Sequence, residues 1–113
     1  MSDKQNHKKW RKKFREGVYK RDNYACRKCG QKDGDLDAHH ITDRHELPNG
    51  GYVLSNGITL CEPCHIKAGK HHITGGKEWE TGFHPNDLYD MICSSLIKAE
   101  EDSLSLTNFK NRI

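Results

Sequence analysis

Two C-x-x-C pairs constrain the fold of this chain more than any other feature of its sequence. The first pair is Cys26 and Cys29, and the second is Cys61 and Cys64. Each pair can present two thiolates from one tight turn, and two such turns complete the tetrahedral shell of a structural zinc ion. Redox chemistry at one pair is the alternative, but two pairs in a reducing compartment favour a closed metal site. We therefore predict a fold held together by structural zinc.

The low apolar content of the chain supports the same prediction. Its 113 residues are 33% hydrophobic, with a mean hydropathy of −1.00. A domain this small buries only about 65% of its unfolded surface, and a structural metal is the usual supplement to a thin core. The length predicts a single domain, 1–113. The aromatic residues and the dense Cys/His cluster argue against a disordered chain.

Positive charge is concentrated at the N-terminal end. Residues 1–32 carry twelve Lys/Arg and three Asp/Glu, a net of +9, whereas residues 33–113 carry a net of −6. Within 4–22, Trp10, Phe14 and Val18 recur every four positions and predict a helix whose apolar stripe packs on the core. Its basic faces indicate a phosphate-rich partner, and a solvated tail is the alternative.

The N-terminal residues contain no apolar run of signal-peptide length, and no stretch approaches the roughly 18 apolar residues that span a bilayer. We therefore expect a cytoplasmic protein with no membrane association. A cytoplasmic location keeps thiols reduced, which again favours metal binding over disulfides.

The rest of the chain predicts a hairpin followed by helices. A long connector containing Pro48-Asn49-Gly50-Gly51 separates two apolar segments, which is typical of a hairpin with a large loop. The predicted strands are Leu36–Thr42 and Val53–Leu60, and the predicted helices are Glu62–Lys70 and a final one within 85–102, capped by Asn86. Residues 71–84 are expected to be irregular and the last dozen frayed. Cys93 is expected to be a small buried residue on the final helix.

The 31 residues between the two cysteine pairs exceed the roughly 15–20 of a simple zinc ribbon. They contain the run Asp37-Ala38-His39-His40-Ile41 and the residue Asn56, and His65 directly follows the last cysteine of the pairs. Over residues 18–70 this order resembles the HNH endonucleases of the four-cysteine zinc subtype, including small phage and bacterial nucleases. The resemblance implies an α+β fold with a zinc-stapled ββα-metal (His-Me finger) core at 23–70, a basic N-terminal helix at 4–22 and a C-terminal helix.

The resemblance also implies roles for the site residues. His40 would be the general base, and His39 and His65 would bind a catalytic divalent metal. Asn56 would orient the loop and, through it, His40. The activity implied is hydrolysis of DNA phosphodiester bonds to 5′-phosphate and 3′-hydroxyl products. The implied phosphate contacts on the basic helix are Lys8, Lys9, Arg11, Lys12, Lys13, Arg15, Lys20 and Arg21.

The chain departs from the family at one position. Some members carry a third histidine ligand one helical turn after the second, and Gly69 stands there instead. His71 and His72 lie at the wrong spacing for that turn, and we leave them unassigned as surface or loop residues, together with His7, His45 and His84. A site with two protein ligands and several waters favours Mg²⁺ or Mn²⁺ over tightly held zinc.

The sequence leaves three questions open: whether the chain is catalytic, how it acts on DNA, and in which biological setting it works. A non-catalytic zinc module that binds nucleic acid, or a zinc knuckle that binds protein, would need the cysteines but not His40. The chain is expected to act as a monomer that nicks duplex DNA or as a homodimer, with weak sequence preference because no sizeable recognition domain is present. Phage packaging, restriction, homing and repair are all compatible settings, so a larger phage or restriction assembly is a candidate partner.

Overall fold

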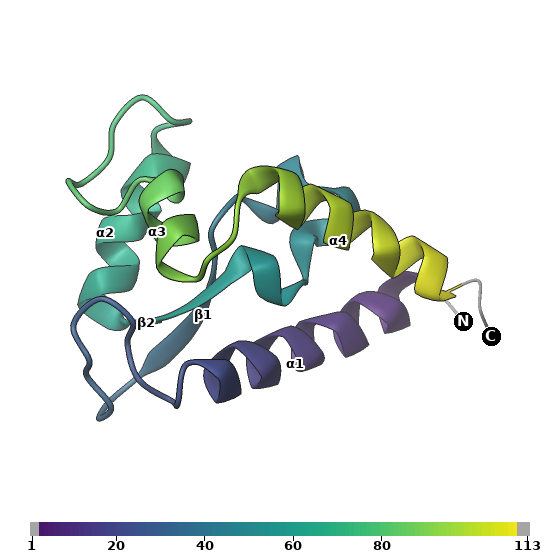
Figure 1. Ribbon diagram of the computed structural model, residues 1–113, viewed down its shortest axis with the longest axis horizontal. Helices are drawn as coiled ribbons and strands as arrows, with labels where there is room; N and C mark the ends of the chain where they lie inside the picture. Colours follow the sequence, from purple (N-terminus) through teal and green to yellow (C-terminus); the bar gives the residue numbers. More distant parts are fainter. Residues whose placement is uncertain (1–2, 111–113) are drawn as a thin grey trace.

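The computed structural model describes residues 3–110, and the side chains of residues 7–106. A two-stranded antiparallel sheet, β1 (Leu36–His40) and β2 (Gly57–Cys61), lies at the centre. Helix α1 (Asp3–Arg21) covers one side of it, and α2 (Glu62–Ile73) covers the other (Figure 1). The C-terminal helices α3 (Pro85–Met91) and α4 (Leu96–Lys110) complete the α+β fold.

The predicted N-terminal helix is confirmed, and its apolar stripe packs on the sheet. Phe14 and Val18 are 3% and 0% exposed, and together with Tyr52 they form a small core beneath α1. The helix ends at Arg21, and the backbone then turns through left-handed conformations at Asn23 and Tyr24. This reversal carries the chain directly into the first cysteine pair.

The hairpin is confirmed, but its strands are shorter than predicted. The register pairs Leu36 with Cys61 and His40 with Gly57, so β1 ends at His40 rather than at Thr42. The segment expected to begin the second strand instead forms a 3₁₀ turn at Leu54–Asn56. The reason is local. The Asn56 side chain forms hydrogen bonds with the backbone of Thr42, and these take the place of strand-to-strand hydrogen bonds at that residue.

The second predicted helix is confirmed at its start and runs further than predicted. Pro63 occupies its first turn, where a missing N–H costs nothing. The helix continues past Lys70 to Ile73, so His71 and His72 are helical and not part of an irregular segment.

The predicted final helix is two helices. His84 and not Asn86 caps α3, with its Nδ1 accepting the Asn86 N–H, while the Asp87 carboxylate accepts the His84 N–H. α3 ends in a reversal at Cys93, whose φ is 55°. The backbone N–H of Ser94 bonds the Tyr89 carbonyl, as in a Schellman motif. The prediction that Cys93 is buried on a helix is therefore wrong, because its side chain is exposed.

The main core lies between the sheet and the C-terminal helices. Every residue of β2 is buried, and Ile58, Leu60 and Leu88 are at most 1% exposed. α4 packs on the loop between the strands, and α1 begins where α4 ends, at one end of the molecule (Figure 1). Within the part of the chain that the structure describes, no helix is both long and apolar enough to cross a membrane.

Candidate metal centres and active site

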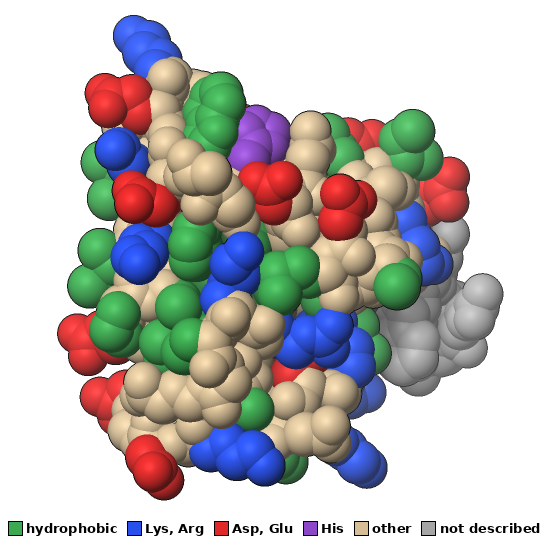
Figure 2. All heavy atoms as spheres, turned by 60° about the vertical axis from the view of Figure 1, so that its left-hand side comes forward, with side chains coloured by type: hydrophobic (Ala, Val, Ile, Leu, Met, Phe, Trp, Pro, Cys, Tyr) green, Lys and Arg blue, Asp and Glu red, His purple; other side chains and the backbone are tan. Residues whose placement is uncertain are grey.

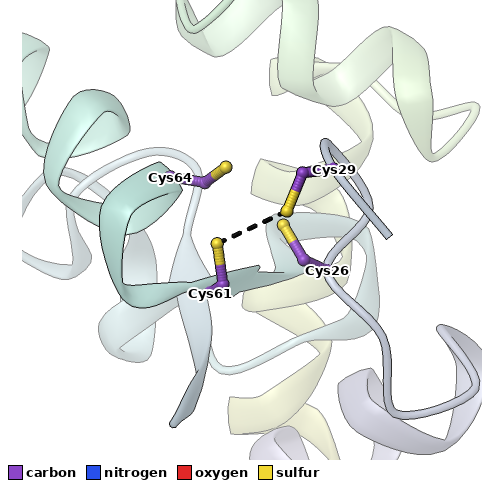
Figure 3. A group of neighbouring side chains, drawn as sticks. All are labelled: Cys26, Cys29, Cys61 and Cys64. Carbon is purple, nitrogen blue, oxygen red and sulfur yellow. Dashed lines mark hydrogen bonds between the residues drawn. The ribbon is translucent and has the colours of Figure 1, made fainter. Parts of the chain in front are cut away.

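The four paired cysteines converge on one point (Figure 3). Cys26 and Cys29 lie in the loop after α1, Cys61 ends β2, and Cys64 lies in the first turn of α2. Their sulfur atoms all lie within 4.8 Å of one another, and the Cys29 and Cys61 sulfurs are 3.6 Å apart. Thiolates bound tetrahedrally to zinc at about 2.3 Å stand roughly 3.8 Å apart. The geometry is therefore suited to structural zinc, as the sequence predicts.

The protonation chemistry of the cluster also suits a metal. Burial raises the pKa of Cys26, but backbone N–H groups of Cys61, Cys29 and Lys28 outweigh it and bring that pKa down to about 7. The pKa of Cys64 is raised, first by burial and then by the neighbouring sulfurs. Four crowded sulfurs cannot all ionise alone, and a bound divalent cation would stabilise the thiolate form that metal binding requires.

His39 and His40 occupy opposite faces of β1. His39 is 4% exposed and faces α2, with its ring centroid 5.1 Å from that of His65. His40 faces α1 and stacks on Phe14 with ring centroids 4.4 Å apart. Both histidines nevertheless line one open pocket of about 260 Å³ beside β1. The other residues lining it are Asp37, Ala38, Asp43, Arg44, His65, Gly69 and His72.

The ring of His40 is held between two aromatic residues. Phe14 stacks on it, and Tyr52 meets it at 80° with centroids 5.1 Å apart. Its Nε2 is buried without a hydrogen-bond partner. Burial, followed by the charge of Arg44, lowers the pKa of His40 to about 4. The imidazole is therefore neutral at physiological pH and can accept a proton.

The surroundings of His39 and His65 suit metal-binding imidazoles. Burial, followed by the charges of His65 and His72, lowers the pKa of His39 well below its ordinary value, so its imidazole is neutral. The Nδ1 of His65 lies 3.3 Å from the Asp37 carboxylate. A carboxylate that accepts the Nδ1–H leaves Nε2 of His65 with its lone pair available.

Asn56 is fully buried and ties the end of β1 to the hairpin loop. Its side-chain oxygen accepts the Thr42 N–H at 2.9 Å, and its amide donates to the carbonyls of Thr42 and Gly51. Its backbone carbonyl also accepts the Ile41 N–H. Asn56 thus fixes the backbone of the two residues that follow His40.

His72 is the site residue that sequence reasoning misses. The expectation of a surface or loop residue is wrong, because His72 lies half-buried on α2 and lines the pocket. Its ring centroid is 5.2 Å from that of His39, and its Nε2 is 3.0 Å from the His40 carbonyl oxygen. The available signal is its distance of seven residues from His65, because two helical turns place both on one face. His7 and His45 are exposed, as predicted.

The basic residues of α1 fall into two groups, those on the exposed surface and Arg21, which contacts the rest of the fold. Lys8, Arg11, Lys12 and Arg15 line one shallow surface pocket with Glu16 and Tyr19. Arg21 instead donates to the carbonyls of Leu54 and Gly57 and pairs with Asp22. The face that carries α2 and α3, by contrast, mixes positive and negative side chains (Figure 2). Helix α1 is therefore the element on which exposed positive charge is concentrated.

Comparison with known proteins agrees with the geometry. The family model described as HNH endonuclease matches residues 26–71, from the first cysteine of the zinc site to the last turn of α2. No curated protein and no solved structure gives a significant match. The matched segment holds the four cysteines, β1, β2 and every residue that lines the histidine pocket except His72. Residues 26–71 are therefore similar to an HNH endonuclease domain, which supports a nuclease-type function in general.

Proposed function

We propose that this chain is a metal-dependent DNA endonuclease that hydrolyses phosphodiester bonds and leaves 5′-phosphate and 3′-hydroxyl ends. One observation carries the proposal. His39 and His40 point to opposite sides of β1 and still open into the same pocket, where His65 joins them. A proton acceptor and a pair of metal-binding imidazoles thus border one space, as metal-assisted hydrolysis requires.

His40 is the general base of this proposal. Its neutral ring is held between Phe14 and Tyr52 and would take the proton of the attacking water through Nδ1, since Nε2 is buried. Asn56 is the positioning residue, because its hydrogen bonds to Thr42 fix the backbone just beyond His40. Arg44 lines the same pocket and brings a positive charge to where a phosphate would lie.

His39 and His65 would hold the divalent metal, with Mg²⁺ and Mn²⁺ the ions favoured by a site of few protein ligands. A bound ion would stabilise charge on the phosphate and on the leaving 3′ oxygen. The donor set fits such an ion, because His39 is neutral and the Asp37 carboxylate lies 3.3 Å from Nδ1 of His65, where it would orient that ring. Zinc bound by the four cysteines would have no open position and would serve the fold alone.

The exposed basic residues of α1 would hold the DNA backbone. Lys8, Arg11, Lys12 and Arg15 form one surface, and Lys9, Lys13 and Lys20 extend the positive charge of the helix. Phosphate contacts of this kind are independent of sequence and weaken with salt. We therefore propose weak sequence preference. One pocket cuts one strand, so a monomer would nick duplex DNA.

A plasmid-nicking assay tests this function. Wild-type protein with Mg²⁺ or Mn²⁺ should convert supercoiled plasmid to the open-circular form, and DNA ligase should reseal the nicks because they carry 5′-phosphate and 3′-hydroxyl ends. His40→Ala should lose at least about 100-fold in rate, and His45→Ala, an exposed histidine of the same loop region, should cut as the wild type does. A wild type that binds plasmid but leaves it supercoiled in every divalent ion would instead identify a non-catalytic zinc module.

A further inference from the structure

Helix α2 carries a second histidine toward the pocket, two turns after His65. We infer that His72 is a third protein ligand of the divalent metal that His39 and His65 would bind, an inference that rests on the proposed function. The site would then take a borderline transition-metal ion in preference to Mg²⁺, because three imidazoles suit Mn²⁺, Co²⁺, Ni²⁺ or Zn²⁺ better than they suit a hard ion that keeps its waters.

The first support is the space that Gly69 leaves. Gly69 stands one turn after His65, and a Cβ added there would meet no atom within 4 Å. His72 stands almost one turn further, and α2 remains helical through it because the helix ends at Ile73. Seven residues make nearly two turns, so His65 and His72 share the helix face that looks toward β1. Gly69 is itself among the residues that line the pocket together with both histidines.

The second support is the tautomer of His72. Its Nε2 lies 3.0 Å from the carbonyl oxygen of His40. A carbonyl oxygen can only accept, so Nε2 must carry the proton, and the neutral ring then has its lone pair on Nδ1. Metal-binding histidines usually donate their other ring N–H to a carbonyl or a carboxylate in this way. His65 has a comparable neighbour, because its Nδ1 lies 3.3 Å from the Asp37 carboxylate.

The third support is the spacing of the rings around His39. The centroid of His39 lies 5.1 Å from that of His65 and 5.2 Å from that of His72. Imidazoles bound to one ion through nitrogens about 2.1 Å from it have centroids roughly 5 Å apart. Among the described residues only the four cysteines have all their ligand atoms within 4.8 Å. Binding through three rings therefore requires a side-chain rotation, for which the His65 side chain, 41% exposed, has room.

Binding of Mn²⁺ to the zinc-loaded protein tests the inference without reference to cleavage. Mn²⁺ is too hard to displace zinc from four thiolates, and its free form is measured directly by electron paramagnetic resonance. We expect one bound Mn²⁺ per wild-type chain, at least about tenfold weaker binding in His72→Ala, and an equal or larger loss in His39→Ala. His71→Ala is the matched control, since His71 neighbours His72 on α2 but does not line the pocket, and it should bind within about twofold of the wild type.

Pulsed paramagnetic resonance of bound Mn²⁺ separates a ligand from a residue that only supports the strand. The nitrogen couplings should report three imidazoles on the wild type and two on His72→Ala. A wild type that shows only two, or a His72→Ala variant that binds as tightly as the wild type while His39→Ala does not, overturns the inference and leaves the proposed function intact. The wild-type count needs no variant to fold. A wild type that binds no Mn²⁺ and cuts no plasmid refutes both proposals.

Discussion

The hydroxyl of Tyr89 donates a hydrogen bond of 2.8 Å to the side-chain oxygen of Asn56. The same hydroxyl lies 2.6 Å from the Thr42 hydroxyl. Tyr89 belongs to α3, outside residues 26–71, whereas Asn56 belongs to the matched family domain. The C-terminal part of the chain therefore reaches into the network that fixes the backbone after His40. We therefore expect α3 to support the candidate site as well as the core.

Removal of this hydroxyl should affect both stability and cleavage. Tyr89→Phe leaves the buried Asn56 oxygen with one donor fewer, and we expect a loss of about 1–2 kcal/mol in the free energy of unfolding. We also expect a several-fold lower kcat in nicking, with little change in KM, because the DNA-binding surface of α1 is untouched. Tyr24→Phe is the control, since that side chain is 58% exposed. Unchanged kcat in a destabilised Tyr89→Phe protein would show that α3 only supports the core.

Loss of one cysteine of the zinc site should weaken the whole fold. Cys26→Ser removes a buried ligand of the cluster, and we expect loss of bound zinc, with helical signal that falls at physiological temperature. Zinc content and far-UV circular dichroism measure the two effects. Cys93→Ser is the matched control because Cys93 is exposed and lies outside the cluster. A Cys26→Ser protein that is metal-free and as stable as the wild type would contradict a structural role for zinc.

The sequence predicts what local patterns determine and misses what tertiary contacts determine. The four-residue period of Trp10, Phe14 and Val18 predicts α1, and the cysteine pairs predict the metal cluster. No such sequence pattern predicts that α3 ends at Met91 or that the chain reverses after it. Cys93 occupies the left-handed position that glycine usually fills, and the reversal is held from outside by the bond of the Ser94 hydroxyl to the Ser55 carbonyl.

The residues of the candidate site also divide into those that local sequence patterns identify and one that depends on tertiary contacts. His39, His40, Asn56 and His65 could be named from their order in the sequence, because each stands at a recognisable place beside the cysteine pairs. His72 could not be named in this way. Its contact with His39 exists because α2 continues for three residues beyond Lys70, to Ile73. Histidine and glycine are both weak helix formers, so local propensity argues against that extension.

The packing of α1 on β2 should tolerate no side chain at Gly57. A Cβ there would lie 2.5 Å from a methyl carbon of Val18 and 2.7 Å from the Phe14 ring. We expect Gly57→Ala to lower the free energy of unfolding by about 1–3 kcal/mol and to slow nicking, since Phe14 stacks on His40. Gly69→Ala meets no neighbour and should gain up to about 1 kcal/mol in a helix. Denaturant titration of the two variants measures the free energy of unfolding, which should fall in Gly57→Ala and rise in Gly69→Ala.

The buried carboxylate of Asp22 should make stability fall at acid pH. Burial raises its pKa, but hydrogen bonds from Arg21 and the Thr59 N–H, with the charge of Arg21, outweigh burial and leave the pKa below 3.8. A depressed pKa contributes stability that is complete above the unfolded-state value of about 3.9 and is lost as the pH falls through the folded-state value.

Asp22→Asn isolates this contribution from the zinc thiolates, which titrate equally in both proteins. We expect the variant to be about 2 kcal/mol less stable at pH 7, with a difference that stays constant down to about pH 5 and shrinks below about pH 4. Urea titrations at several pH values measure it. A difference that stays constant down to about pH 3 would show that the carboxylate charge contributes nothing.

The arginines of α1 should divide into those that bind DNA and one that holds the fold. Arg11 and Arg15 line the exposed basic pocket, whereas the guanidinium of Arg21 donates to the Leu54 and Gly57 carbonyls at 2.8 and 2.6 Å. Removal of one side chain that binds a phosphate should lower the slope of log affinity against log salt by about 0.9, equally for all DNA sequences. We therefore expect Arg11→Ala and Arg15→Ala to reduce the slope at unchanged stability.

Arg21→Ala should do the reverse, with a loss of about 2 kcal/mol in stability because Asp22 and two backbone carbonyls lose a charged donor, and with an unchanged slope. Lys77→Ala, an exposed lysine beyond α2, should change neither quantity. Fluorescence anisotropy on labelled duplex at several salt concentrations, together with urea titration, gives both measurements for every variant. Slopes that fall for Arg21→Ala and not for Arg11→Ala would move the DNA-binding surface from the outer face of α1 to the side that faces the hairpin loop.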